Sequence, residues 1–69
     1  MPYKSIEDLP ENVRNPLPKH AQEIYKETFN NAWDEYQERD DRETVSHKVA
    51  WSAVKKSYVK KDDKWVARE

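Results

Sequence analysis

The distribution of helix-breaking residues constrains this chain more than any other feature of its sequence. All four prolines lie within residues 2–18, and the 69-residue chain contains no glycine. Residues 19–69 therefore lack both residue types that most readily interrupt a helix. The absence of glycine also excludes a P-loop, a dinucleotide-binding glycine fingerprint and an EF-hand loop, which all need glycine at fixed positions. We expect long, uninterrupted helices after the proline-rich segment.

The composition of the chain sets limits on its class. Charged residues make up 39% of it and hydrophobic residues 35%, a balance that alone favours disorder. The eight aromatic residues, three of them tryptophan, can however bury enough apolar area for one small core. Without cysteine there is no disulfide framework and no cysteine-based zinc site, and no apolar stretch is long enough for a transmembrane helix. We expect a single domain over residues 1–69 with a cytoplasmic location.

Apolar residues recur every three or four positions in two long segments, which is typical of amphipathic helices. The first covers residues 19–38, with the apolar positions Ala21, Ile24, Tyr25, Phe29, Ala32, Trp33 and Tyr36. The second covers residues 43–59, and a short helix is expected over residues 11–15, bounded by prolines. We interpret the aromatic residues as a hydrophobic core, consisting of Tyr25, Phe29, Trp33, Tyr36, Trp51, Tyr58 and Trp65.

The C-terminal residues have the pattern of a turn followed by a short strand. Residues 60–64 are charged and contain the dipeptide Asp62-Asp63, a typical corner. Trp65-Val66-Ala67 then favours an extended conformation, but a single strand needs a partner. The other extended candidate is Tyr3-Lys4. We therefore predict a mostly α fold, in which three helices pack with a small two-stranded sheet formed by the chain termini.

Charge is distributed unevenly along the chain. Residues 19–43 contain eight acidic and four basic residues, whereas residues 44–69 contain seven basic and three acidic residues. The candidate contact surface in this basic third consists of Lys48, Lys55, Lys56, Lys60, Lys61 and Lys64. Such a cluster attracts the phosphates of nucleic acid or an acidic protein. Such a cluster is more often a solvated helix face, because lysines near a helix C-terminus interact favourably with the helix dipole.

Two further groups of side chains have the chemistry to bind ions. Glu38, Asp40 and Asp41 offer the oxygen ligands that calcium and magnesium prefer. Arginines interspersed among these acids neutralise much of their field, so we predict a solvated loop and no metal site. His47 falls on the apolar side of the third helix, where we expect a partly buried ring bonded to a backbone carbonyl. We expect His20 to hold the preceding proline-rich turn.

Short segments distributed over the whole chain match one known family. They are Met1-Pro2-Tyr3, Asp8-Leu9-Pro10, Leu17-Pro18-Lys19-His20-Ala21-Gln22-Glu23-Ile24-Tyr25, Phe29-Asn30-Asn31-Ala32-Trp33, His47-Lys48-Val49-Ala50-Trp51 and Asp63-Lys64-Trp65. In these segments the chain resembles the ChaB family. The resemblance implies three helices with a small sheet and a role in regulating cation transport, associated with a calcium/sodium–proton antiporter. Related domains in viral proteins also suggest nucleic-acid binding.

No arrangement of residues indicates catalysis. Serine, histidine and carboxylate side chains are present, but no spacing of nucleophile and base stands out, and a chain this small has little room for a deep cleft. We therefore expect no enzyme activity and no cofactor. Our first hypothesis is a small regulatory or interaction protein with a protein partner, such as a membrane cation antiporter. The alternative is a nucleic-acid-binding module that uses the basic C-terminal third.

Overall fold

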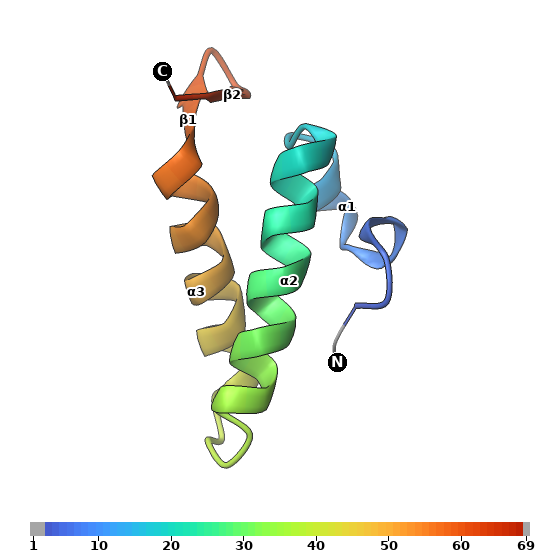
Figure 1. Ribbon diagram of the computed structural model, residues 1–69, viewed down its shortest axis with the longest axis vertical. Coiled ribbons are helices and arrows are strands. Elements are labelled where there is room, and N and C mark those ends of the chain that lie inside the picture. Colours follow the sequence, from blue (N-terminus) through green and yellow to red (C-terminus); the bar gives the residue numbers. More distant parts are fainter. Residues whose placement is uncertain (1–2, 69) are drawn as a thin grey trace.

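The computed structural model describes residues 3–68, which form helices and one β-hairpin (Figure 1). In chain order the elements are η1, a 3-10 helix (Ile6–Asp8), α1 (Glu11–Arg14), α2 (Lys19–Glu35), α3 (Arg42–Ser57), β1 (Tyr58–Lys61) and β2 (Lys64–Ala67). The predicted mostly α fold, with three α-helices and a small two-stranded sheet, is thus confirmed. None of the described helices combines the length and the apolar character that crossing a bilayer demands.

Two prolines mark where helices begin. Pro10 and Pro18 directly precede the first residues of α1 and α2, with φ angles of −56° and −63°. These angles agree with the value that the pyrrolidine ring imposes. After Pro18 nothing interrupts α2 for 17 residues. The helix ends at Glu35, before the predicted end at residue 38, because Tyr36 already has a non-helical conformation with φ −105° and ψ 29°.

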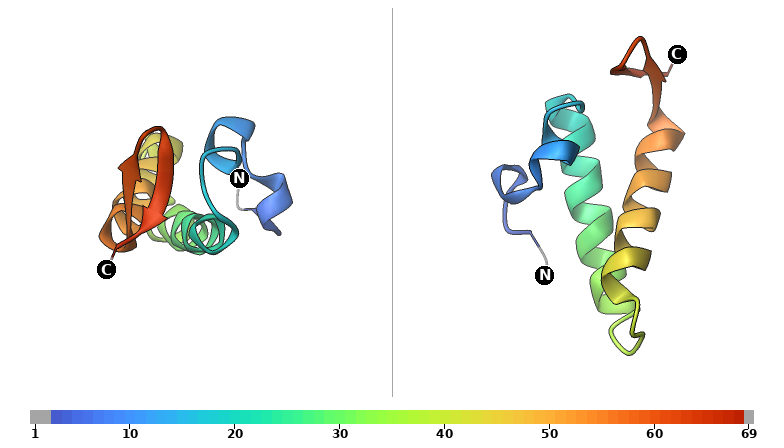
Figure 2. Two further views of the ribbon diagram at one scale, coloured as in Figure 1. Left: turned by 90° about the horizontal axis from the view of Figure 1, so that it is seen from above. Right: turned by 180° about the vertical axis from the view of Figure 1, so that it is seen from behind.

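The core forms around α2, which lies between α3 on one side and residues 3–17 on the other (Figures 1 and 2). Tyr25 and Phe29, from the middle of α2, are completely buried. Two hydrogen bonds attach the N-terminal segment to this helix. The Tyr3 N–H donates to Asn30 Oδ1, and Asn30 Nδ2 donates to the Tyr3 carbonyl, each with a donor–acceptor distance of 2.8 Å. The rest of the buried cluster comes from all parts of the chain: Leu9, Val13, Leu17, Ala21, Ala50, Val54 and Tyr58.

The predicted aromatic core is confirmed except for one ring. The rings that are buried, or pack partly buried against the core, are Tyr25, Phe29, Trp33, Trp51, Tyr58 and Trp65. Tyr36 is half-buried and lies outside this cluster. Trp51 connects the core to the hairpin, because its ring centroid lies 5.2 Å from that of Tyr25 and 5.5 Å from that of Trp65.

The predicted pairing of the two termini is wrong. β2 pairs antiparallel with β1 and not with Tyr3-Lys4. The predicted corner at Asp62 and Asp63 is confirmed, and their φ angles of 51° and 66° match the type I′ turn of tight hairpins. A loop of two residues joins neighbouring strands at a much lower entropic cost than joining the two ends of the chain. To form β1, α3 ends at Ser57 instead of at the predicted Val59.

Replacing the turn by the dipeptide that type I′ turns favour tests this hairpin. Asp62→Asn and Asp63→Gly together should raise the free energy of unfolding by about 1 kcal/mol, because a non-glycine residue at positive φ is disfavoured by roughly that amount. In a chain of this size the gain corresponds to an increase in Tm of about 4–8 °C, measured by circular dichroism. Serine at both positions removes the same two charges without favouring positive φ. Equal stabilisation by both pairs would contradict the turn assignment.

Candidate interaction surface

Two arginines hold the acidic connector between α2 and α3 in place. Arg42 donates its Nε–H to the Trp33 carbonyl, with an Nε–O distance of 2.7 Å, and its guanidinium lies 3.9 Å from the centroid of the Trp33 ring. Arg39 donates two hydrogen bonds to the Asp41 carboxylate, with N–O distances of 2.9 and 3.0 Å. These bonds lower the pKa of Asp41 below its usual range. Asp41 occupies the N-cap position of α3, but its carboxylate pairs with Arg39 and makes no capping hydrogen bond.

The carboxylates singled out as candidate ligands lie on the surface of this connector. Glu38, Asp40 and Asp41 are all exposed. Within residues 3–68, no group of three or more acidic, histidine or cysteine side chains is placed to hold a metal ion. The fold therefore does not bring these three oxygen donors together as a metal centre.

Both histidines pair with tyrosine hydroxyls, which the sequence did not indicate. His47 is partly buried as expected, but Nδ1 shares a hydrogen bond with the Tyr25 hydroxyl, so the expected backbone carbonyl partner is wrong. Burial lowers the pKa of His47 and raises the pKa of Tyr25, which favours the neutral form of both rings. His20 Nδ1 lies 2.9 Å from the Tyr58 hydroxyl. His20 thus connects the start of α2 to the start of the hairpin, and its expected role in the proline-rich turn is wrong.

The candidate lysines are all exposed, but they do not form one continuous patch. The hairpin end carries Lys55, Lys56, Lys60, Lys61 and Lys64, from the last turn of α3 and from both strands. Lys48 lies about two turns earlier on α3, about 10 Å away along the helix axis. We call the group without Lys48 the hairpin-end lysines.

The two faces of the hairpin differ in composition. Residues directly opposite each other in an antiparallel pair share a face, and the faces alternate along each strand. Lys60 lies opposite Trp65, on the same face as the buried Tyr58. Lys61 lies opposite Lys64, on the other face, which points away from the core. The three lysines of the strands are thus divided between an inner face, with Lys60, and an outer face, with Lys61 and Lys64.

The outer face contains residues that the sequence analysis did not single out. Val59 and Val66 lie opposite each other there and remain exposed. Arg68 follows β2 and donates its Nε–H to the Lys55 carbonyl, with an Nε–O distance of 2.8 Å. Its backbone N–H donates to the Ser57 carbonyl, with an N–O distance of 2.9 Å. The mirrored order of residues around Asp62-Asp63, with Val-Lys-Lys before it and Lys-Trp-Val after it, was the available signal for this hairpin. It was obscured because the apolar pattern of α3 continues to Val59.

The charge asymmetry of the sequence becomes an asymmetry along the long axis of the molecule. The described chain measures 37 × 21 × 16 Å, with the connector at one end and the hairpin at the other (Figure 1). The acidic residues of the connector therefore lie far from the hairpin-end lysines. A partner that contacts the outer face of the hairpin meets Lys61 and Lys64 beside two exposed valines.

Comparisons with known proteins agree with one another. The family model described as ChaB matches residues 9–68. Proteins called "Putative cation transport regulator ChaB" from Escherichia coli K12 and from Shigella flexneri are each 57% identical to this chain in an alignment 72 positions long, which covers 94% of this chain and 95% of the relative. The structure titled "NMR solution structure of the putative cation transport regulator ChaB" has a TM-score of 0.87 and 56% identity, and the match covers 99% of this chain and 100% of that one.

Acid should destabilise the chain through His47. Burial lowers the pKa of His47 below its ordinary 6.5, although the nearby charge of Glu43 partly counteracts this shift. The imidazole of the folded chain therefore takes up a proton less readily than that of the unfolded chain. The contribution of neutral His47 is complete above pH 6.5 and is lost as the pH falls through the lowered pKa. The urea midpoint should fall from pH 7 to pH 5, and the fall should be smaller in His47→Gln. A His20→Gln variant serves as the control, because it removes the other histidine and leaves His47 in place. An equal fall of the midpoint in the parent chain and in both variants would exclude His47 as its cause.

Calcium should leave the stability unchanged. A cation raises Tm only if it binds the folded chain more tightly than the unfolded one. With Asp41 paired to Arg39 and no cluster of ligands among residues 3–68, we expect the same Tm in millimolar calcium chloride as in sodium chloride of equal ionic strength. A calcium-dependent increase that disappears in Asp40→Asn would show that the connector does hold a cation.

Proposed function

This chain belongs to the ChaB family, and we propose that it is a non-enzymatic regulator that controls a cation transporter by direct protein contact. The transporter we propose is an antiporter that exchanges calcium or sodium for protons. Contact with the cytoplasmic side of such a transporter requires a cytoplasmic location, which is part of the proposal. Residues 1–69 would act together as one domain.

One observation carries the proposal: the match to relatives named as cation transport regulators covers nearly the whole of both chains. At 57% identity over 94% of this chain, and with a shared fold at a TM-score of 0.87, the helices and the hairpin are all included in the likeness. A regulatory role is therefore the function that the comparisons support. The choice of an antiporter as partner is our own extension of that role.

The hairpin end is the surface that we assign to partner contact. Its lysines are exposed and belong to elements that are fixed by Arg68 and by the contact between Trp51 and Trp65. Complementary charge accelerates encounter and selects partners, even where each exposed pair adds little affinity. Acidic cytoplasmic loops of a membrane protein offer such complementary charge. We therefore expect regulation to depend on the hairpin-end lysines.

A transport assay with purified protein tests this function. Everted membrane vesicles that contain the host antiporter are supplied with the chain, and calcium-driven proton movement is followed with a pH-sensitive dye. The chain should change the initial rate. Lys55→Gln, Lys56→Gln and Lys60→Gln together should raise the concentration needed for half of the effect by about tenfold, because three exposed positive charges at the hairpin end are lost.

A matched triple variant controls for net charge. Lys4→Gln, Lys26→Gln and Lys48→Gln remove the same charge at positions outside the hairpin end and should leave the half-effect concentration unchanged. No effect of the parent chain on transport would contradict the proposed function. Binding of both triple variants and the parent to duplex DNA at two salt concentrations covers the alternative, since a salt-dependent loss confined to the first triple would favour a nucleic-acid partner.

A further inference from the structure

The outer face of the hairpin has an aliphatic centre that the fold leaves uncovered. Val59 and Val66 are the exposed large hydrophobic residues among those the structure describes, with 39% and 40% of their surfaces accessible. They lie directly opposite each other in the β1–β2 register. The inner face of the same hairpin buries Tyr58 and packs Trp65 against Trp51. The two valines are therefore not required for contact with the core.

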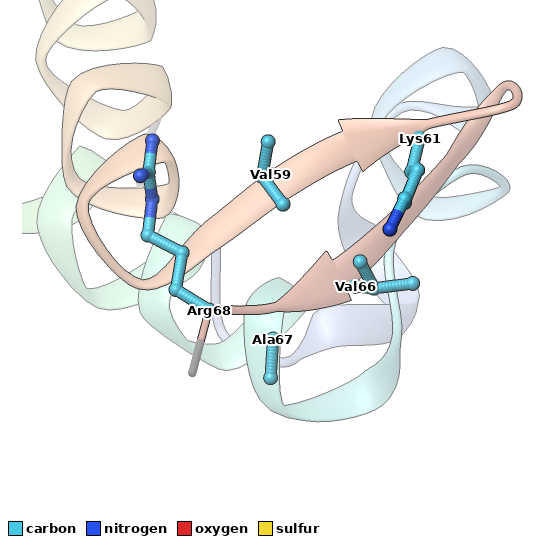
Figure 3. Close-up of a pocket in the computed structure, with 5 residues that line it drawn as sticks. All are labelled: Val59, Lys61, Val66, Ala67 and Arg68. Atoms are coloured by element: carbon cyan, nitrogen blue, oxygen red, sulfur yellow. The ribbon is translucent and has the colours of Figure 1, made fainter.

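These valines belong to a hollow that also contains cationic side chains. Val59, Lys61, Val66, Ala67 and Arg68 line an open depression of about 470 Å³ (Figure 3). Figure 3 shows that the lining side chains come from both strands and from the residue that follows β2. Three of the five lining side chains are thus aliphatic, and the other two carry an ammonium group and a guanidinium group.

Arg68 is held in a fixed position at this hollow. Its Nε–H is bonded to the Lys55 carbonyl, and its backbone is bonded to Ser57. The guanidinium carries four further N–H groups on its two terminal nitrogens, whose fork geometry matches a carboxylate. Because the side chain is already ordered, binding an anion there costs less entropy than ordering a free arginine.

From this arrangement we infer that the outer face of the hairpin is a docking site for an acidic peptide segment that carries an aliphatic residue between carboxylates. The aliphatic side chain contacts Val59 and Val66, and the flanking carboxylates pair with Lys61 and Arg68. The inference rests on the proposed function in one respect, since it takes the segment to be part of the regulated protein. The chemistry of recognition follows from the hollow alone.

The same face is poorly suited to an extended array of phosphates. Asp62 and Asp63 are exposed at the tip of the hairpin, next to Lys61 and Lys64. A bilayer surface or a nucleic-acid duplex that covered the hairpin would bring phosphates close to both carboxylates, where like charges repel. A short peptide seated in the hollow needs to contact only the valines and the cations around them. The acids at the tip thus favour a peptide over a phosphate surface.

Titration of the full chain with a synthetic peptide tests the site. The probe is the blocked pentapeptide Glu-Asp-Leu-Glu-Asp, and binding is followed by amide chemical shifts in nitrogen-15 labelled protein. We expect shifts concentrated at residues 59–61 and 66–68. Lys61→Glu should weaken binding by about tenfold, because it turns an attraction into a repulsion, and Val66→Thr should weaken it by about threefold while keeping a β-branched residue in the strand.

Controls separate this site from general attraction of charges. Lys48→Glu makes the same charge change on α3, about two helical turns before Lys55 and outside the hairpin, and should weaken binding by less than twofold. Replacing the leucine of the peptide by serine should weaken binding as much as Val66→Thr does. The chemical-shift dispersion of residues 58–67 in each variant shows whether its hairpin is intact. If Lys61→Glu loses this dispersion, the charge-removing Lys61→Gln takes its place.

The outcomes distinguish the inference from the proposed function. Equal weakening by Lys61→Glu and Lys48→Glu, equal binding of the serine peptide, or no shifts at the hairpin would overturn the docking site. Tighter binding of phosphatidylglycerol vesicles or of duplex DNA than of the peptide, with shifts at the same residues, would overturn the choice of occupant. Peptide binding as expected in a chain that has no effect on transport would leave the docking site in place and contradict the proposed function.

Discussion

The completely buried rings of Tyr25 and Phe29 join the two sides of this molecule. On one side they pack with His47 and Trp51 of α3, and on the other the ring of Tyr3 lies 4.7 Å from that of Phe29. A chain of this size buries only roughly 60% of its unfolded surface. Each buried ring contributes about 1.5–3 kcal/mol, a large share of a total stability on the order of 5–15 kcal/mol. The α2–α3 pair and the N-terminal segment therefore depend on the same two side chains.

The position of the hairpin follows from this core through a chain of aromatic contacts. Trp51 lies against the core on one side and against Trp65 on the other, and the hydroxyl of Tyr58 is bonded to His20 at the start of α2. Arg68 then fixes the end of β2 to the last turn of α3. The inner face of the hairpin is thus used for packing, which leaves the outer face available for a partner. A heavily charged chain in this way presents one basic surface with an aliphatic centre in a defined orientation.

Much of the helical architecture could be predicted from the sequence, because it depends on local patterns. The prolines and the repeat of apolar residues predict α2 and α3 to within a few residues. The turn at Asp62-Asp63 was predicted, but the strand that precedes it was missed, because Val54 and Tyr58 continue the helical spacing of α3 and residues 58–59 were assigned to the helix. The tyrosine partners of the histidines could not be predicted, since they depend on how α2 and α3 are rotated against each other.

The candidate surface could be predicted only in outline for the same reason. The exposure of each lysine followed from its polar neighbours, but the separation of Lys60 from Lys61 depends on the strand register. The central claim is that the outer face of the hairpin contacts a cation transporter. It is tested most directly by placing a photo-reactive benzoylphenylalanine at Val66 in living cells, with Glu27 on the exposed face of α2 as the control position. The account predicts a crosslink to a membrane cation transporter from Val66 and none from Glu27, whereas crosslinks from Glu27 alone, or from Val66 only to nucleic acid, would contradict it.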